Sequence, residues 1–410
     1  MKRNIFLLIL CCFYFSTSLS QQSNLSVEKI MRDPLWMGTF PSEISWGANS
    51  ENIYFMYNPE ANPADSLYRI NINQPRNIVA VDWKAEKELL PKYGDFNDRR
   101  TKKVYTRDGN LFIFDLKKEK ELELLDLGQE IRDARFLADE NLISFVMDNN
   151  AFLYRLNSGR VEKLTNINSG NKKDKEEEKL SEQDQWLKQE NLELLQVVKE
   201  REESKENSRK YREMTGDPEE FSFYAGDKTI SNLQVSPTAK YVTFSLITRS
   251  DNKDTKVPDY ADASGYTVNL PARSKVGSEP TKVEMAIYDV KKDSVYMIQT
   301  NKLPGIKDLP DYVKDYREKE WKQEAREVIP SGPYFSKDGR KAVVNIRSLD
   351  NKDRWIALLD LQTGALSSLD RQRDEAWIAG PGIGWTFSGG TLGWLPDNET
   401  IYFQSEKTGY

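Results

Sequence analysis

The stretch FSKDGRKAVVNIRSLDNKDRWIALLDLQTGALSSLD, from Phe335 to Asp370, has the pattern of one complete four-stranded antiparallel unit. Phe335 is followed at +7 and +9 by Ala342 and Val344, with the polar turn Ser336–Gly339 in the gap. Residues two apart share one face of a strand, so this spacing predicts a strand, a tight turn and a second strand. The same spacing occurs four more times, as Trp46/Ile53/Phe55, Phe136/Ile143/Phe145, Val235/Val242/Phe244 and Trp394/Ile401/Phe403.

Each of these openings is followed by further short strands, and the turns between them, such as Asn157–Arg160, use residues that tolerate left-handed backbone. A four-stranded meander cannot bury both faces alone, and copies that pack face to face around an axis form a β-propeller. The step from Trp46 to Phe136 spans two blades of about 45 residues. We therefore predict an all-β fold, with a degenerate blade carrying strands at Lys102–Thr106 and Leu111–Leu116.

Composition sets the class of protein. A chain of 410 residues with 38% hydrophobic content can bury a large core, and we expect one interrupted propeller. Its 59 basic and 65 acidic side chains nearly cancel, which leaves a net charge of −6. Because no long basic stripe could follow a phosphate backbone, nucleic-acid binding is not expected.

Residues 1–20 have the pattern of a cleavable signal peptide. Lys2 and Arg3 give a positive start, Ile5–Phe15 is apolar, and Ser18–Ser20 is a small-residue exit, so cleavage is expected near Ser20. The apolar run is shorter than the roughly 20 residues of a membrane-spanning helix, which makes a membrane anchor the weaker alternative. The sequence thus predicts an exported protein, periplasmic or secreted, with no membrane span in its mature chain.

Both cysteines of the chain, Cys11 and Cys12, lie inside this apolar run. The bulky Leu10 before them disfavours a lipoprotein signal, which remains the other alternative. Both are expected to leave with the signal, so the mature protein would depend on packing rather than on disulfides.

A change in composition divides the rest of the chain. We expect a lead-in over residues 21–40 and a propeller over 41–410 that is truncated in its sixth recognisable blade, which begins at Leu392. Half a blade would expose strand edges, so we expect these residues to be the front part of a longer protein. An open propeller completed by another chain is the alternative. Three insertions interrupt the propeller, a helical one at 172–214 and loop or helix insertions at 250–280 and 303–330.

The insertion Lys172–Met214 contains neither Gly nor Pro and carries Leu187, Leu194 and Val198 at heptad-like steps, which predicts helix. A solvated charged linker is the alternative. In the third insertion, Asp311–Val328 has the pattern of a short amphipathic helix.

Histidine is absent from the sequence. A Ser-His-Asp triad and a His-based zinc site both need imidazole, so these residues cannot assemble either. Carboxylate chemistry remains, with Asp374-Glu375 as a candidate pair, although adjacent carboxylates are more often a solvated loop. The segment Gly384–Gly390 imitates a nucleophile elbow, but Thr386 stands where G-x-S-x-G needs glycine, so a Gly-rich connection between blades is expected there.

Five further motifs stand out in the sequence, namely Asn232–Pro237, Gly265–Thr267, Leu270–Gly277, Gly393–Asp397 and Ile401–Ser405. These motifs resemble the propeller region of the prolyl oligopeptidase (S9) serine peptidases, in particular exported bacterial members akin to dipeptidyl peptidase IV. The resemblance spans most of residues 40–410.

In that family a C-terminal α/β-hydrolase domain carries Ser, Asp and His, and the propeller restricts access to short peptides. The resemblance therefore implies a substrate-gating propeller whose catalytic domain lies beyond Tyr410, with peptides and that domain as partners and a homo-oligomer as a further candidate. The glutamates with which dipeptidyl peptidases hold a substrate amino group have no counterpart that we can place. A stand-alone TolB-like binding propeller and a carboxylate- or calcium-dependent propeller hydrolase stay open. No catalytic, cofactor-binding or metal-ligating residue is assigned, and no cofactor is expected.

Overall fold

The structure is a computed structural model that describes residues 26–31, 38–48, 50–60, 62–172, 181–194, 196–215, 221–380, 382–384 and 389–407. The chain forms two compact units, Met1–Lys92 and Tyr93–Tyr410. The predicted signal peptide at 1–20 lies outside the described residues.

The first unit contains one antiparallel sheet in the order β1-β2-β3-β4, which we call sheet 1. The strands of sheet 1 are β1 (Ser42–Trp46), β2 (Asn52–Tyr57), β3 (Ser66–Asn71) and β4 (Gln74–Ala80). Two short helices accompany it, α2 (Val27–Ile30) and α3 (Trp83–Glu88). The Asp82 side chain accepts a hydrogen bond from Lys84 N and thereby caps the start of α3.

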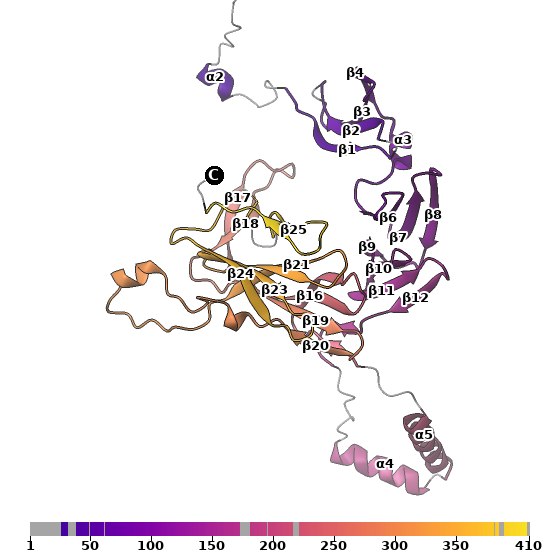
Figure 1. The fold of residues 1–410 in the computed structure, drawn as a ribbon. Helices are drawn as coiled ribbons and strands as arrows, with labels where there is room; N and C mark the ends of the chain where they lie inside the picture. Colours follow the sequence, from indigo (N-terminus) through magenta and orange to yellow (C-terminus); the bar gives the residue numbers. More distant parts are fainter. Residues whose placement is uncertain are drawn as a thin grey trace, which may run out of the picture. The chain divides into compact units, whose positions relative to one another are not determined.

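The second unit contains four four-stranded antiparallel sheets and a final pair of strands (Figure 1). Sheet 2 is β5 (Asp95–Phe96), β6 (Lys102–Arg107), β7 (Asn110–Asp115) and β8 (Lys120–Leu125). Sheet 3 is β9 (Arg132–Phe136), β10 (Leu142–Met147), β11 (Asn150–Arg155) and β12 (Arg160–Lys163). Sheet 4 is β15 (Thr229–Val235), β16 (Tyr241–Thr248), β19 (Lys282–Asp289) and β20 (Ser294–Met297). Sheet 5 is β21 (Val328–Phe335), β22 (Ala342–Ser348), β23 (Asp353–Leu359) and β24 (Leu366–Arg373), and sheet 6 is β25 (Leu392–Trp394) with β26 (Ile401–Phe403).

The repeated spacing in the sequence corresponds to one register. The opening residue and the residue at +7 are paired partners across the first two strands of a sheet, as in Phe335 with Ala342. The other four copies pair in the same way, Trp46 with Ile53, Phe136 with Ile143, Val235 with Val242, and Trp394 with Ile401. The all-β class and its four-stranded antiparallel units are confirmed.

Sheet 2, expected to be degenerate, is complete. Its opening residue is Phe96, which pairs with Lys103 at +7, and Tyr105 stands at +9. A lysine at +7 breaks the apolar pattern, which is why the sequence did not show this copy. Lys103 nevertheless takes the buried position, 4% exposed, with its Nζ 4.9 Å from the centroid of the Phe96 ring. Its aliphatic stem replaces an apolar side chain there.

Successive sheets of the second unit share hydrophobic clusters. Val104 of sheet 2 belongs to one cluster with Phe145 of sheet 3, and Met285 of sheet 4 belongs to another with Val344 of sheet 5. Val343, the neighbour of Val344, belongs to the cluster that includes sheet 6. Adjacent residues of β22 therefore serve opposite faces of the strand, and sheet 5 is packed on one face against sheet 4 and on the other against sheet 6. This is the packing of consecutive propeller blades.

The helical insertion consists of two helices, α4 (Glu182–Leu194) and α5 (Gln196–Thr215). The strands on either side of it, β13 (Ile167–Asn168) and β14 (Phe223–Tyr224), pair in parallel, so the insertion leaves and rejoins the sheets at neighbouring points. Trp186 is 61% exposed and Leu187 is 43% exposed. No helix within the described ranges is both long and apolar enough to cross a membrane.

The insertion at 250–280 forms a hairpin of β17 (Asp254–Asp259) and β18 (Val268–Ser274) between β16 and β19. In the third insertion the predicted helix over Asp311–Val328 is wrong. The 3₁₀ helix η2 (Thr300–Lys302) precedes the insertion, and inside it the 3₁₀ helix η3 (Asp311–Asp315) is followed by irregular chain up to β21. The segment contains the aromatic residues Tyr312, Tyr316 and Trp321, and aromatic residues have weaker helix propensity than Ala, Leu, Lys or Glu. Tyr312 packs edge-on against Trp321 instead, with ring centroids 5.8 Å apart.

Candidate functional site

A cavity of about 1460 Å³ lies in the second unit and is lined by residues from five sheets. The lining comes mainly from the first strand of each sheet, β5, β9, β15, β21 and β25, and from the turns that follow these strands. First strands of successive blades face the propeller axis, so the repeat itself positions this cavity. Polar and charged side chains such as Asp133, Arg135 and Gln234 stand beside apolar ones in this lining.

A β-bulge recurs on the cavity side of three of these sheets. In each, the opening residue pairs with +7, the residue at −1 pairs with +8, and the residue at −4 pairs with +10. One extra residue therefore stands on the first strand. The residue at −3 takes a left-handed conformation, with φ of 54° at Asp133, 50° at Asn232 and 110° at Gly332. Bulges change the direction of side chains, and both the −3 and the −1 residues of these strands line the cavity.

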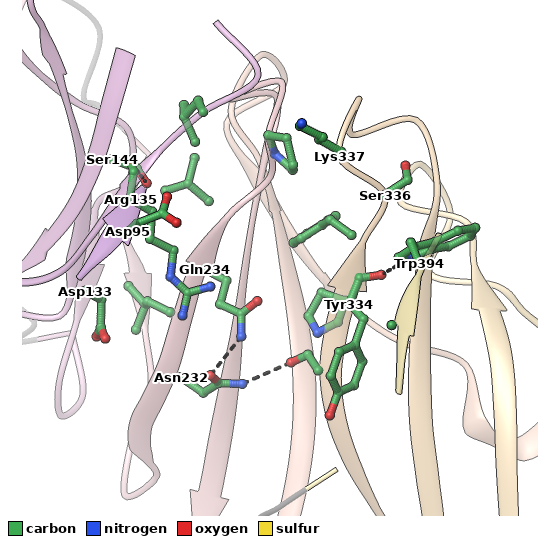
Figure 2. Close-up of a pocket in the computed structure, with 18 of the residues that line it drawn as sticks. Asp95, Asp133, Arg135, Ser144, Asn232, Gln234, Tyr334, Ser336, Lys337 and Trp394 are labelled. Atoms are coloured by element: carbon green, nitrogen blue, oxygen red, sulfur yellow. Dashed lines mark hydrogen bonds between the residues drawn. The ribbon is translucent and has the colours of Figure 1, made fainter. Parts of the chain in front are cut away.

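The bulges of sheets 4 and 5 are joined by hydrogen bonds. Asn232 Nδ2 donates to Gly332 O at 3.0 Å, and Gln234 Nε2 donates to Asn232 Oδ1 at 3.1 Å (Figure 2). On the far side of sheet 5, Trp394 Nε1 donates to Tyr334 O at 2.9 Å and connects sheet 6. Side-chain amides and an indole thus tie neighbouring first strands together around the cavity.

Charged side chains of both signs line the part of the cavity formed by sheets 2 and 3. Asp95 accepts a hydrogen bond from Phe136 N at 2.9 Å, and burial raises the pKa of this carboxyl even though that bond and the Arg135 charge act to lower it. Asp133 and Arg135 come from the bulge of β9 and are both exposed to the cavity. Burial also raises the pKa of Tyr334. The site offers hydrogen-bond donors, acceptors and both charges to a ligand.

The Gly-rich connection between sheets 5 and 6 runs close to other parts of the chain. A Cβ at Gly390, which has φ of 67°, would stand 2.0 Å from Gly382 O. A Cβ at Gly389 would stand 1.7 Å from the Tyr334 hydroxyl, next to the cavity. Close approach of backbone therefore explains these glycines. Residues 385–388 of the elbow-like segment, including Thr386, lie outside the described residues.

The Asp374-Glu375 pair does not form an acid–base site at the cavity. Asp374 Oδ1 accepts hydrogen bonds from Ala376 N and Trp377 N and stabilises a turn. Glu375 accepts from Asp311 N at 2.8 Å and from Arg373 Nε at 2.7 Å. Both carboxylates therefore have structural partners, and neither lines the cavity.

The sequence analysis gave none of the polar cavity residues a binding role, although Asn232 and Gln234 lie in one of the motifs that carry the family resemblance. A signal was present, because Asp133, Asn232 and Gly332 stand three residues before an opening residue and all three types tolerate left-handed backbone. In the part of the chain that the structure describes, no group of three or more Asp, Glu, His or Cys side chains could hold a metal ion.

No protein-family model matches the sequence, and no curated protein matches it significantly. Among solved structures, the chain is similar to one from Bacteroides ovatus described as a dipeptidyl aminopeptidase IV, with 11% identity and a TM-score of 0.40 over 88% of this chain and 40% of that one. It is similar to Porphyromonas gingivalis dipeptidyl peptidase 4, with 12% identity and a TM-score of 0.39 over 86% of this chain and 44% of that one. It is also similar to TolB from Acinetobacter baumannii, with 13% identity and a TM-score of 0.29 over 80% and 52% of the two chains. The chain thus spans about half or less of the length of these similar structures.

Proposed function

We propose that this chain is the substrate-binding propeller of an exported serine peptidase of the prolyl oligopeptidase family, and that its cavity receives oligopeptides. The observation that carries the proposal is the cavity of about 1460 Å³ lined by bulged first strands with polar side chains. Its volume exceeds the roughly 300–1,000 Å³ of a pocket for a small molecule. A short peptide is a ligand of suitable size.

The chemistry of the lining also suits a peptide. A peptide presents N–H and C=O groups along its length and opposite charges at its ends. The cavity offers side-chain amides, hydroxyls and an indole, together with the charges of Asp133 and Arg135. The motif Asn232–Pro237, which carries part of the sequence resemblance to the family, lies on β15 and the turn after it and contributes to the lining.

The catalytic groups would belong to an α/β-hydrolase domain encoded beyond Tyr410. The 410 residues include no histidine, and acyl transfer by a Ser-His-Asp triad needs that base. We therefore expect the chain by itself to show no peptide or ester hydrolysis. Turnover by the purified chain that a serine-directed inhibitor abolishes would contradict this part of the proposal. Reading the DNA downstream of the Tyr410 codon for a G-x-S-x-G motif tests it independently.

Peptide binding is tested by calorimetry on the 410-residue chain with an equimolar library of short peptides. Replacing Arg135 by Ala removes a cavity-lining cation, and Arg160→Ala is the matched control because Arg160 is exposed on the outermost strand of the same sheet. Loss of one hydrogen bond to a charged group, about 1.5 kcal/mol, should weaken binding roughly tenfold in Arg135→Ala. Equal affinity in the two variants, or no binding by the unmodified chain, would contradict a peptide-binding cavity.

A further inference from the structure

The turns that follow the first strands meet at one end of the cavity and bond from sheet to sheet. Asn97 Nδ2 of sheet 2 donates to Glu140 Oε2 of sheet 3 at 3.2 Å. Ala138 N of sheet 3 donates to Pro237 O of sheet 4 at 3.0 Å. Asp338 N of sheet 5 donates to Asn398 Oδ1 of sheet 6 at 3.3 Å. We call this the turn end of the cavity, and the opposite end, at the bulges, the bulge end.

One contact at the turn end does not join neighbours. Lys337 Nζ of sheet 5 lies 2.8 Å from Asp98 Oδ1 of sheet 2, although sheets 3 and 4 stand between them in the order of packing. Both residues line the cavity. Figure 2 shows Lys337 at the end of the site away from Asp133 and Asn232. The ion pair therefore spans the cavity at its turn end, whereas the hydrogen bonds described above join adjacent sheets.

We infer that Asp98 and Lys337 form an ionic latch that holds the turn end narrow, so that ligands enter and leave the cavity at the bulge end. The turn-end bonds join sheet 2 to 3, sheet 3 to 4 and sheet 5 to 6, whereas the contact of Lys337 with Asp98 joins sheets 2 and 5 and so restrains the span across the cavity. At the bulge end, Asp133 and Asn232 are exposed to the cavity, and the ion pair of Lys337 with Asp98 lies at the other end.

The ion pair of the latch is weak, and the latch can therefore open and close. The side chains of Lys337 and Asp98 are 62% and 57% exposed, so water and salt screen their attraction. Exposed pairs of this kind shift an equilibrium by roughly 1.5- to fivefold. Raising the salt concentration should therefore shift the population toward a wider turn end. The identity of the ligand rests on the proposed function, whereas the latch itself does not.

The test measures the span between sheets 2 and 5 by pulsed electron–electron resonance. Nitroxide labels are placed at Arg99→Cys and Arg340→Cys, two exposed positions on the two turns, in the 410-residue chain with Cys11 and Cys12 replaced by Ser. The unmodified latch is compared at low salt and at about 1 M salt, where the screening length is roughly 3 Å. This salt comparison leaves Asp98 and Lys337 unsubstituted, so it stays informative if a variant of either residue fails to fold.

Three variants complete the test. Lys337→Gln should raise the population at longer label distances roughly 1.5- to fivefold and remove the response to salt, and the exchanged pair Asp98→Lys with Lys337→Asp should restore the narrow distribution. Lys341→Gln is the matched control, because it breaks an exposed ion pair to Glu399 that joins the neighbouring sheets 5 and 6. A distance distribution that is the same in Lys337→Gln, in the control and at high salt would overturn the latch. Because no peptide is present, this outcome is independent of whether the cavity binds peptides.

Discussion

Replacing Asp353 by Asn should loosen sheet 5 more than any other single polar change near the third insertion. Asp353 is fully buried, and its carboxylate accepts from Arg326 Nη2 at 2.6 Å, from Arg371 Nε at 2.8 Å and from Arg373 Nη1 at 2.6 Å. The same arginines hold the insertion, since Arg326 donates to Gly305 O at 2.9 Å. One buried carboxylate thus connects β23, β24 and residues 303–330.

The magnitude follows from what remains after the change. An asparagine keeps the shape but places an amide N–H₂ against guanidinium donors and removes the negative charge. Each arginine retains an outer acid, as in the 2.7 Å contact of Arg371 with Asp308, so the loss is less than three full charge-assisted bonds. Removing one partner of a buried ion pair costs about 3–5 kcal/mol, and the retained partners place the effect near 3 kcal/mol, or about 100-fold in a local opening equilibrium.

Hydrogen exchange read by mass spectrometry is the suitable assay, because a chain with two compact units need not unfold in two states. Peptides from Val328–Arg373 should exchange about 100-fold faster in Asp353→Asn, whereas those from sheet 3 should not change. Asp311→Asn is the control, since Asp311 is 60% exposed and pairs with Lys314. Equal exchange in the two variants would mean that the outer acids alone hold the arginines, and the reasoning would fail.

Other changes have equally definite outcomes. Gly390→Ala should destabilise the link between sheets 5 and 6 by at least about 3 kcal/mol in a urea titration, because its Cβ meets backbone, while Gly277→Ala, also at positive φ but in open space, should cost only about 1 kcal/mol; equal effects would contradict the contact. Burial, with the Asp289 charge adding to it, raises the pKa of Tyr296 to about 12 from 10.0, so the folded state holds this proton more tightly than the unfolded state. The stability that Tyr296 contributes is complete below the pKa of the unfolded state and is lost as pH rises through the pKa of the folded state. Tyr296→Phe should flatten this decline in the free energy of unfolding with pH. An unchanged slope of that free energy against pH would refute the role given to Tyr296. Deleting Lys172–Met214 with a short Gly-Ser bridge should leave the β-sheet circular dichroism intact and alter assembly or ligand access, whereas loss of the sheet signal would show that α4 and α5 belong to the core.

The sequence was sufficient for the repeated unit because register and spacing are linked. A hairpin whose strands pair from Phe335 to Ala342 must place its apolar residues at fixed intervals, and the same intervals mark four other sheets. The sequence did not show the repeat in sheet 2, because the buried position at +7 is held by Lys103. A search for apolar residues at this spacing misses a lysine that is buried through its aliphatic stem. The helix prediction failed at Asp311–Val328, where contacts between aromatic rings override a helical periodicity.

The cavity could not be predicted because it is built from residues distant in the sequence. Asn232 and Gly332, 100 positions apart, meet only when sheets 4 and 5 pack together. The bulge at −3 was visible as a choice of residue types, but its consequence, that side chains at −3 and −1 both turn toward the cavity, depends on the pairing of the second strand. Charge pairs such as Lys337 with Asp98 leave no local pattern at all.

The proposed role of the cavity is tested most directly by mapping where a peptide binds. A short peptide that carries a benzophenone group is irradiated with the 410-residue chain, and the cross-linked residues are identified by mass spectrometry. The account predicts cross-links on the first strands β9, β15 and β21, around Arg135, Asn232 and Tyr334, and their loss when unlabelled peptide is added in excess. Cross-links confined to outer strands such as β12 and β24, or insensitive to competition, would contradict a peptide-binding cavity.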